Sequence, residues 1–172
     1  VVAVTAVTAQ NTSGLVTSHP IPPHIVGEQI RAVLDDVDVA AVKIGLIPSP
    51  DTEDAIADAL AHLAVPIVLD PVLRNGQDGA LMGAGTLRLW ELATVATPNV
   101  PEAEALTGSL VHTRASMEAA AANLARTGAA ILLKGGHLPH IGADLVHGAA
   151  RHWLPYDAPL PGLNVHGTGC HL

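Results

Sequence analysis

The sequence predicts an α/β protein in which helices cover a mostly parallel sheet. Short apolar runs rich in β-branched residues alternate along the 172 residues with longer segments of helical periodicity. The apolar runs contain few polar residues, which is typical of parallel strands buried on both faces. Strands that alternate with helices in this way pair in parallel through crossover connections. The length fits a single domain, residues 1–172.

Five apolar runs are expected to form the strands of this sheet. They are VVAVTAVTA (1–9), VAAVKIGLI (39–47), VPIVLDP (65–71), ATVATPN (93–99) and AAILLKGG (129–136). Two further short strands around Gly148 are expected to form a hairpin over residues 143–155. The glycine-bearing segment 73–85 is the best candidate for a mobile loop.

Four segments between the strands are expected to be helices, and most carry boundary signals. Residues 49–63 begin with capping side chains and carry acidic residues in the first turn, where they complement the helix dipole. Residues 100–108 open with Pro101 and close with Gly108. Residues 22–37 and the alanine-rich residues 113–128 complete the set.

Composition and charge restrict the class of function. Hydrophobic residues make up 49% of the chain and phenylalanine is absent, so the core is built from Val, Leu, Ile and Ala. The formal net charge of −8 argues against nucleic acid or an anionic membrane as a partner. With no apolar run of about 18 residues and one cysteine, a cytoplasmic protein is expected.

Polar and charged residues follow three of the expected strands. Asp70 ends one run, Asn99 and Glu102 follow another, and Lys134 ends a third. Ligands of open parallel sheets bind beyond the carboxyl ends of the strands. Taken singly, each residue is better explained as a helix cap or an ion-pair partner. Their recurrence at one predicted sheet edge favours a site.

Phosphoryl transfer is the chemistry that these residue types suggest. Lys134 would contact phosphate oxygens, and the following Gly135 and Gly136 would let the backbone approach closely. Asp70 and Glu102 would hold Mg²⁺, which takes one or two carboxylates in proteins. The sequence lacks the GxxxxGK[ST] pattern of a P-loop.

The last residues place the only cysteine in a glycine turn, HGTGC at 166–170. Successive amides of GTG are suited to bind an anion. Cys170 would act there as a base or a nucleophile, or it is a buried inert thiol. A cysteine hydrolase is the least favoured alternative, because it leaves Lys134 without a role. The ten histidines fit no standard zinc spacing.

Several motifs together resemble one known family. In chain order they are TAVTAQNTSGL (5–15), HPIPPHIV (19–26), VKIGL (42–46), VLDPV (68–72), TPNVPEAEALTG (97–108), LLKGGHL (132–138) and HGTGC (166–170). The chain is similar along nearly its whole length to hydroxymethylpyrimidine/phosphomethylpyrimidine kinases of thiamine biosynthesis. The resemblance implies a ribokinase-like three-layer sandwich with helices on both faces of the sheet.

The resemblance also implies an activity. The family uses ATP and Mg²⁺ to phosphorylate 4-amino-5-hydroxymethyl-2-methylpyrimidine and then its monophosphate. The resemblance also implies a homodimer. The neighbouring pyridoxal kinases make pyridoxal kinase or dual specificity one alternative. The family has a further strand before the first motif and further helices after the last. We therefore expect a longer protein, and an inactive pyrimidine-binding fragment is a second alternative.

Site residues carry over by position, first on the substrate side. The resemblance implies that Gln10 hydrogen-bonds the pyrimidine ring and that residues 42–46, Gly45 and Leu46 among them, line its pocket. The family often has methionine at the position of Leu46. Asp70 and Val72 would lie near the substrate and phosphate.

On the nucleotide side, the resemblance implies that Asn99 and Glu102 organise Mg²⁺ and its water, with Lys134 near the transferring phosphates. The same resemblance makes the 167–170 turn catalytic. Gly167, Thr168 and Gly169 would bind the anion, and Cys170 would be the base or nucleophile.

Overall fold

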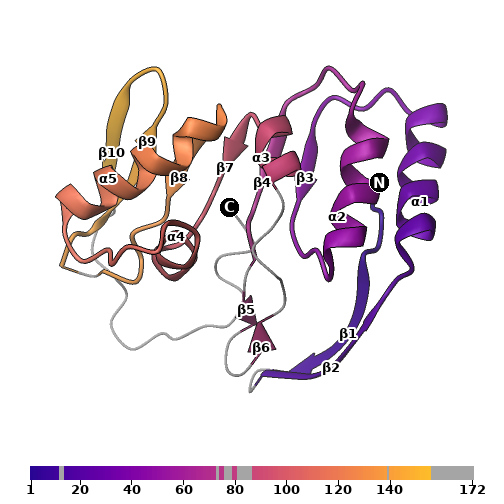
Figure 1. The fold of residues 1–172 in the computed structure, drawn as a ribbon, viewed down its shortest axis with the longest axis horizontal. Coiled ribbons are helices and arrows are strands. Elements are labelled where there is room, and N and C mark those ends of the chain that lie inside the picture. The colour runs from indigo at the N-terminus through magenta and orange to yellow at the C-terminus, as the bar shows by residue number, and fades with distance from the viewer. Residues whose placement is uncertain (12–13, 73, 76–78, 81–86, 139, 156–172) are drawn as a thin grey trace. The chain divides into compact units, whose positions relative to one another are not determined.

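The structure is a computed structural model that describes residues 1–11, 14–72, 74–75, 79–80, 87–138 and 140–155 (Figure 1). The chain divides into two compact units, Val1–Thr94 and Val95–Leu172. Both contain helices and parallel strand pairs, as predicted for an α/β protein. Whether the units form the single expected domain stays a prediction. Of the helices in the described ranges, none combines the length and apolar character needed to cross a membrane.

The first unit contains a parallel strand pair with a helical crossover. Strands β3 (Val42–Ile44) and β4 (Ile67–Leu69) pair in register Val42↔Ile67, and α2 (Pro50–Leu60) connects them. The Ser49 side chain caps α2 by accepting a hydrogen bond from the Thr52 amide at 3.2 Å, as the capping pattern predicted. The remaining helices of this unit are α1 (Pro23–Asp36) and α3 (Leu87–Leu92).

The prediction of a buried strand over residues 1–9 is wrong. Strand β1 (Ala6–Asn11) instead pairs with β2 (Gly14–Pro20) in an antiparallel hairpin, outside the sheet of β3 and β4. Val1 and Val7 are 91% and 58% exposed. The turn-forming sequence Asn-Thr-Ser-Gly follows the apolar run, so the chain returns on itself and the pairing is local.

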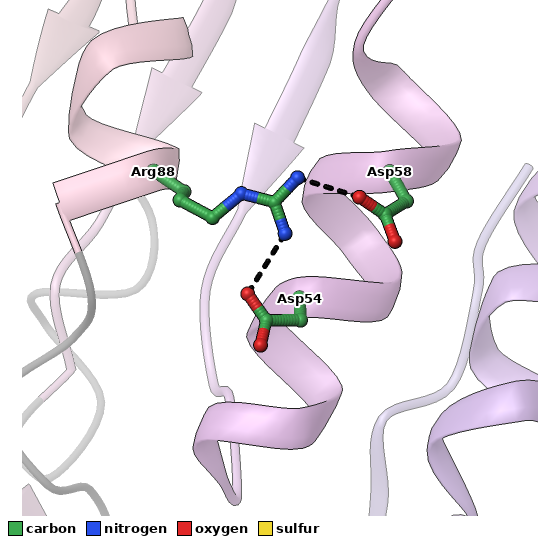
Figure 2. Close-up of polar contacts among 3 residues, drawn as sticks. All are labelled: Asp54, Asp58 and Arg88. Atoms are coloured by element: carbon green, nitrogen blue, oxygen red, sulfur yellow. Dashed lines mark hydrogen bonds and ion pairs between the residues drawn. The ribbon is translucent and has the colours of Figure 1, made fainter.

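An exposed arginine joins α3 to α2 (Figure 2). The Arg88 guanidinium donates to Asp54 Oδ1 at 2.8 Å and to Asp58 Oδ1 at 2.5 Å. These two hydrogen bonds, the one to Asp58 foremost, raise the pKa of Arg88 above its ordinary value. All three side chains are largely in solvent, so the cluster orients α3 more than it stabilises the fold.

The predicted loop 73–85 lies only partly within the described residues. There, β5 (Arg74–Asn75) and β6 (Gly79–Ala80) form a short antiparallel pair. Neither this pair nor α3 or β2 was predicted, because each is too short or too polar to show a clear period.

The second unit contains a mixed sheet. Strand β7 (Val95–Ala96) pairs in parallel with β8 (Ala130–Leu133), which pairs antiparallel with β9 (Ala143–His147). Strand β10 (Arg151–Pro155) returns along β9, which confirms the hairpin predicted around Gly148. Helices α4 (Val100–Thr107) and α5 (Arg114–Leu124) precede β8, and the short 3₁₀ helix Ala125–Thr127 links α5 to it.

One face of this sheet packs on α5. Met117 and Ala121 of the helix and Ile131, Leu133 and Leu145 of the strands are fully buried. At the margin, Glu118 accepts hydrogen bonds from Arg151 at 2.8 Å and from the Trp153 indole at 3.3 Å. Most buried hydrophobic side chains are Val, Leu, Ile or Ala, as predicted, but Met117 and, in the first unit, Trp90 are buried as well.

We expect Leu145→Ala to lower the free energy of unfolding by about 2–5 kcal/mol, because it truncates a fully buried side chain of β9 and leaves a cavity in the core. Leu110→Ala, at a position that is 72% exposed, is the matched control and should change it by less than about 0.5 kcal/mol. Urea unfolding measures both. Equal effects of the two substitutions would contradict the packing described for β9.

Candidate functional site

Asn99 and Glu102 form a reciprocal cap at the start of α4. The Asn99 side chain accepts a hydrogen bond from the Glu102 amide at 2.9 Å, and the Glu102 carboxylate accepts one from the Asn99 amide at 2.8 Å. This capping box satisfies two backbone donors that a helix start leaves open. It also fixes the Glu102 carboxylate, which is only 8% exposed, directly after β7.

Lys134 is brought beside this cap by the parallel pairing of β7 and β8. Its amide donates to the Pro98 carbonyl at 2.9 Å, and Asn99 and Lys134 form a parallel β-bridge. The Lys134 side chain is 8% exposed. Three of the predicted residues therefore meet at the carboxyl ends of two neighbouring strands, which is the ligand-binding edge of such a sheet.

Asp144 supports the same edge and was not predicted from the sequence. Its Oδ1 accepts a hydrogen bond from the Gly135 amide at 2.7 Å, so the strand β9 fixes the turn that follows Lys134. The turn continues with a hydrogen bond from the Leu138 amide to the Gly135 carbonyl at 2.8 Å. The signal in the sequence was a carboxylate inside the otherwise apolar run ADLV.

Asp70 holds the corresponding place in the first unit. It follows β4, its amide donates to the Ile44 carbonyl at 2.8 Å, and its side chain is 5% exposed. The Val72 amide donates to the Asp70 carbonyl at 2.8 Å, which turns the chain away from the sheet. Asp70 and Glu102 belong to different units, so their joint binding of Mg²⁺ stays a prediction.

The substrate-side residues all lie in the first unit. Gly45 and Leu46 follow β3 directly and are half-buried. Gln10 is exposed on β1, and the hairpin register shifts between Ala9 and Gln10. Such a bulge redirects the side chains beside it. The structure therefore gives Gln10 a local feature that the sequence pattern did not reveal.

The turn that contains Gly167, Thr168, Gly169 and Cys170 lies outside the described residues, so its predicted roles are untested. Among the residues that are described, no group of three or more His, Cys, Asp or Glu side chains is placed to hold a metal ion.

Two solved structures that this chain resembles are kinases. Phosphomethylpyrimidine kinase from Clostridium difficile 630 matches with a TM-score of 0.79 and 30% identity, over 91% of this chain and 71% of that one. Pyridoxal kinase from Staphylococcus aureus, in complex with AMP-PCP and pyridoxal, matches with a TM-score of 0.81 and 25% identity, over 98% and 64%. The fold is that of a ribokinase-like α/β kinase with a mixed, mostly parallel sheet, which confirms the predicted class.

Sequence comparison identifies the family. The phosphomethylpyrimidine kinase family matches residues 1–172, and the chain belongs to it. Hydroxymethylpyrimidine/phosphomethylpyrimidine kinase from Streptomyces coelicolor is 40% identical over 176 residues, which cover 98% of this chain and 65% of the relative. The Haemophilus influenzae enzyme of the same description is 37% identical over 180 residues, 98% of this chain and 67% of the relative. The chain thus spans about two thirds of the length of these relatives, and the predicted resemblance is confirmed.

We expect Asn99→Ala to lower the free energy of unfolding by about 1 kcal/mol, because the capping box is lost. Asn99→Ser should retain most of the wild-type stability, because serine also caps helices. The Thr113 and Ser116 capping box of α5 is the matched control, and Thr113→Ala should cost a similar amount. Chemical denaturation measures all three. A serine variant as unstable as the alanine variant would show that Asn99 does more for the fold than cap α4.

Proposed function

We propose that this protein transfers the γ-phosphoryl group of ATP to 4-amino-5-hydroxymethyl-2-methylpyrimidine and then to its monophosphate. The observation that carries the proposal is the meeting of Asn99, Glu102 and Lys134 at the ends of β7 and β8, in a chain that belongs to the phosphomethylpyrimidine kinase family throughout. A homodimer, which the resemblance implies, and a cytoplasmic location, which the sequence composition suggests, are part of the proposal.

The nucleotide side of the site fits Mg-ATP by its chemistry. A carboxylate is the kind of ligand that Mg²⁺ prefers, and an ammonium group neutralises phosphate oxygens. When bound, Mg-ATP supplies the phosphoryl group that is transferred. Lys134 would hold the phosphates and offset their charge. The cap at Asn99 fixes the Glu102 carboxylate in one rotamer, and this carboxylate would hold the metal or its water. Groups fixed before the substrate arrives need no reorganisation during transfer.

On the acceptor side, Gln10 would hydrogen-bond the pyrimidine ring and Gly45 and Leu46 would line its pocket. Val72 and Asp70 would lie near the hydroxymethyl group and the phosphate. The amides of the GTG turn would bind the transferring phosphoryl group, and Cys170 would take the proton of the attacking hydroxyl. A thiol is a modest base, but phosphoryl transfer depends mainly on positioning and charge neutralisation.

Pyridoxal is the second candidate substrate. It is favoured by the likeness to the Staphylococcus aureus pyridoxal kinase, a protein solved with AMP-PCP and pyridoxal, whose match covers 98% of this chain. The identity of 25% to that kinase is lower than the 40% to the Streptomyces coelicolor enzyme. We therefore rank the pyrimidine first.

The proposal is tested by ADP release from Mg-ATP with the pyrimidine, its monophosphate and pyridoxal in parallel. Turnover with the first two and little with pyridoxal supports it. Turnover with pyridoxal alone replaces it by the second candidate. Pyrimidine binding without turnover would support the alternative of an inactive binding protein.

In an active preparation, we expect Lys134→Met to raise the KM for ATP and to lower kcat about 10²-fold or more, because the buried ammonium group at the strand end is lost. Arg126→Met, at an exposed cation of the 3₁₀ helix Ala125–Thr127, is the matched control and should retain normal kinetics. Steady-state ADP release at varied ATP measures both. Unchanged kinetics of Lys134→Met would remove this residue from the phosphate site.

We expect Cys170→Ala to lower kcat about 10²–10⁴-fold while the affinity for the pyrimidine stays near normal, because a base contributes to transfer and not to ground-state binding. Calorimetric binding of the pyrimidine and ADP release separate the two quantities. Weaker binding with normal turnover would instead mean that the thiol only packs against the substrate.

A further inference from the structure

The backbone of Val4, just before the hairpin, is hydrogen-bonded through both its amide and its carbonyl. The Gln29 side chain of α1 accepts a hydrogen bond from the Val4 amide at 3.0 Å and donates one to the Val4 carbonyl at 3.1 Å. One side-chain amide thus pairs with both backbone groups of a residue, much as a neighbouring strand would. This double contact ties the start of the hairpin to α1.

Thr5 adds the contact to the proposed substrate loop. Its hydroxyl donates to the Leu46 carbonyl at 2.7 Å, a short and part-buried hydrogen bond across 41 positions of the chain. Its carbonyl accepts a hydrogen bond from the Ile21 amide at 2.9 Å, just after β2 ends. Thr5 is therefore bonded to the loop that follows β3 through its side chain and to the far strand of the hairpin through its backbone.

The hairpin itself is a free-standing two-stranded sheet. Among the described strands, β1 and β2 pair with each other and with no further strand (Figure 1). Most side chains described on them are exposed. A two-stranded hairpin in water is marginally stable alone, so its direction depends on how its base is held. We call the base the point where Thr5 is hydrogen-bonded to Ile21 and to Leu46.

We propose that Thr5, assisted by Gln29, is a positioning residue that sets the hairpin carrying Gln10 relative to the loop carrying Gly45 and Leu46. The inference rests on the proposed function, in which Gln10 and Leu46 contact the same pyrimidine. Thr5 contacts no reacting atom; it holds two binding segments in one register. Loss of its hydroxyl also leaves the Leu46 carbonyl without this hydrogen bond.

The test replaces the hydroxyl and keeps the shape. We expect Thr5→Val to raise the KM and the dissociation constant for the pyrimidine about fivefold, the factor that one such hydrogen bond is worth. The kcat and the KM for ATP should stay within about twofold, and Thr5→Ser should restore the wild-type values. Thr17→Val on β2 is the matched control, since its exposed hydroxyl has no hydrogen-bond partner among the described residues.

A second readout needs no activity. In the ligand-free protein, amide hydrogen exchange at Ile21 and along the hairpin should be about fivefold faster in Thr5→Val and unchanged in Thr17→Val. An unchanged KM and unchanged exchange in Thr5→Val would overturn the inference, as would a fall in kcat alone. If wild-type protein neither binds nor phosphorylates the pyrimidine, the proposed function fails. Faster exchange would then still support the hold on the hairpin, and unchanged exchange would overturn it.

Discussion

The hydrogen bond from the Lys134 amide to the Pro98 carbonyl joins the ends of β7 and β8, and the meeting of Asn99, Glu102 and Lys134 depends on it. Parallel pairing brings the carboxyl ends of successive strands to one edge, so residues more than 30 positions apart become neighbours. Asn99 then serves at once as the end of a strand connection, the cap of α4 and the neighbour of Lys134. A shift of β8 by one residue would turn its alternating side chains over and separate these groups.

The capping box has a consequence beyond the stability of α4. A carboxylate buried to 8% exposure is costly unless hydrogen bonds hold it. The Asn99 amide supplies one at 2.8 Å, so the rotamer of Glu102 is fixed by the same contact that starts the helix. On the other strand, Asp144 fixes the Gly135 turn in a comparable way. The same hydrogen bonds therefore cap the helix and fix the carboxylate. A structural role of Asn99 and Glu102 as a helix cap is compatible with the proposed role in binding.

Local signals in the sequence predicted the local structure well. The caps at Ser49 and Asn99 and the turn at Gly148 were visible because the residues that make them are adjacent in the chain. The hairpin β1–β2 was missed because Val, Ala and Thr suit an exposed strand as well as a buried one. Asp144 and Thr5 were missed because their roles lie in contacts with other segments of the chain. The register shift at Gln10 was missed together with the hairpin that contains it.

The misread segment is also the one with a proposed binding role. An apolar run placed in a core would gain stability from burial, whereas this run leaves Val7 and Val16 58% and 74% exposed. Hydrogen bonds of Gln29 and Thr5 hold the start of the hairpin, and its two strands pair with each other beyond that point. Segments whose sequence conflicts with the simplest rule for their environment are often those shaped by a ligand. A hairpin that is fixed at its base and exposed along its length can contact a small substrate without the rest of the unit having to move.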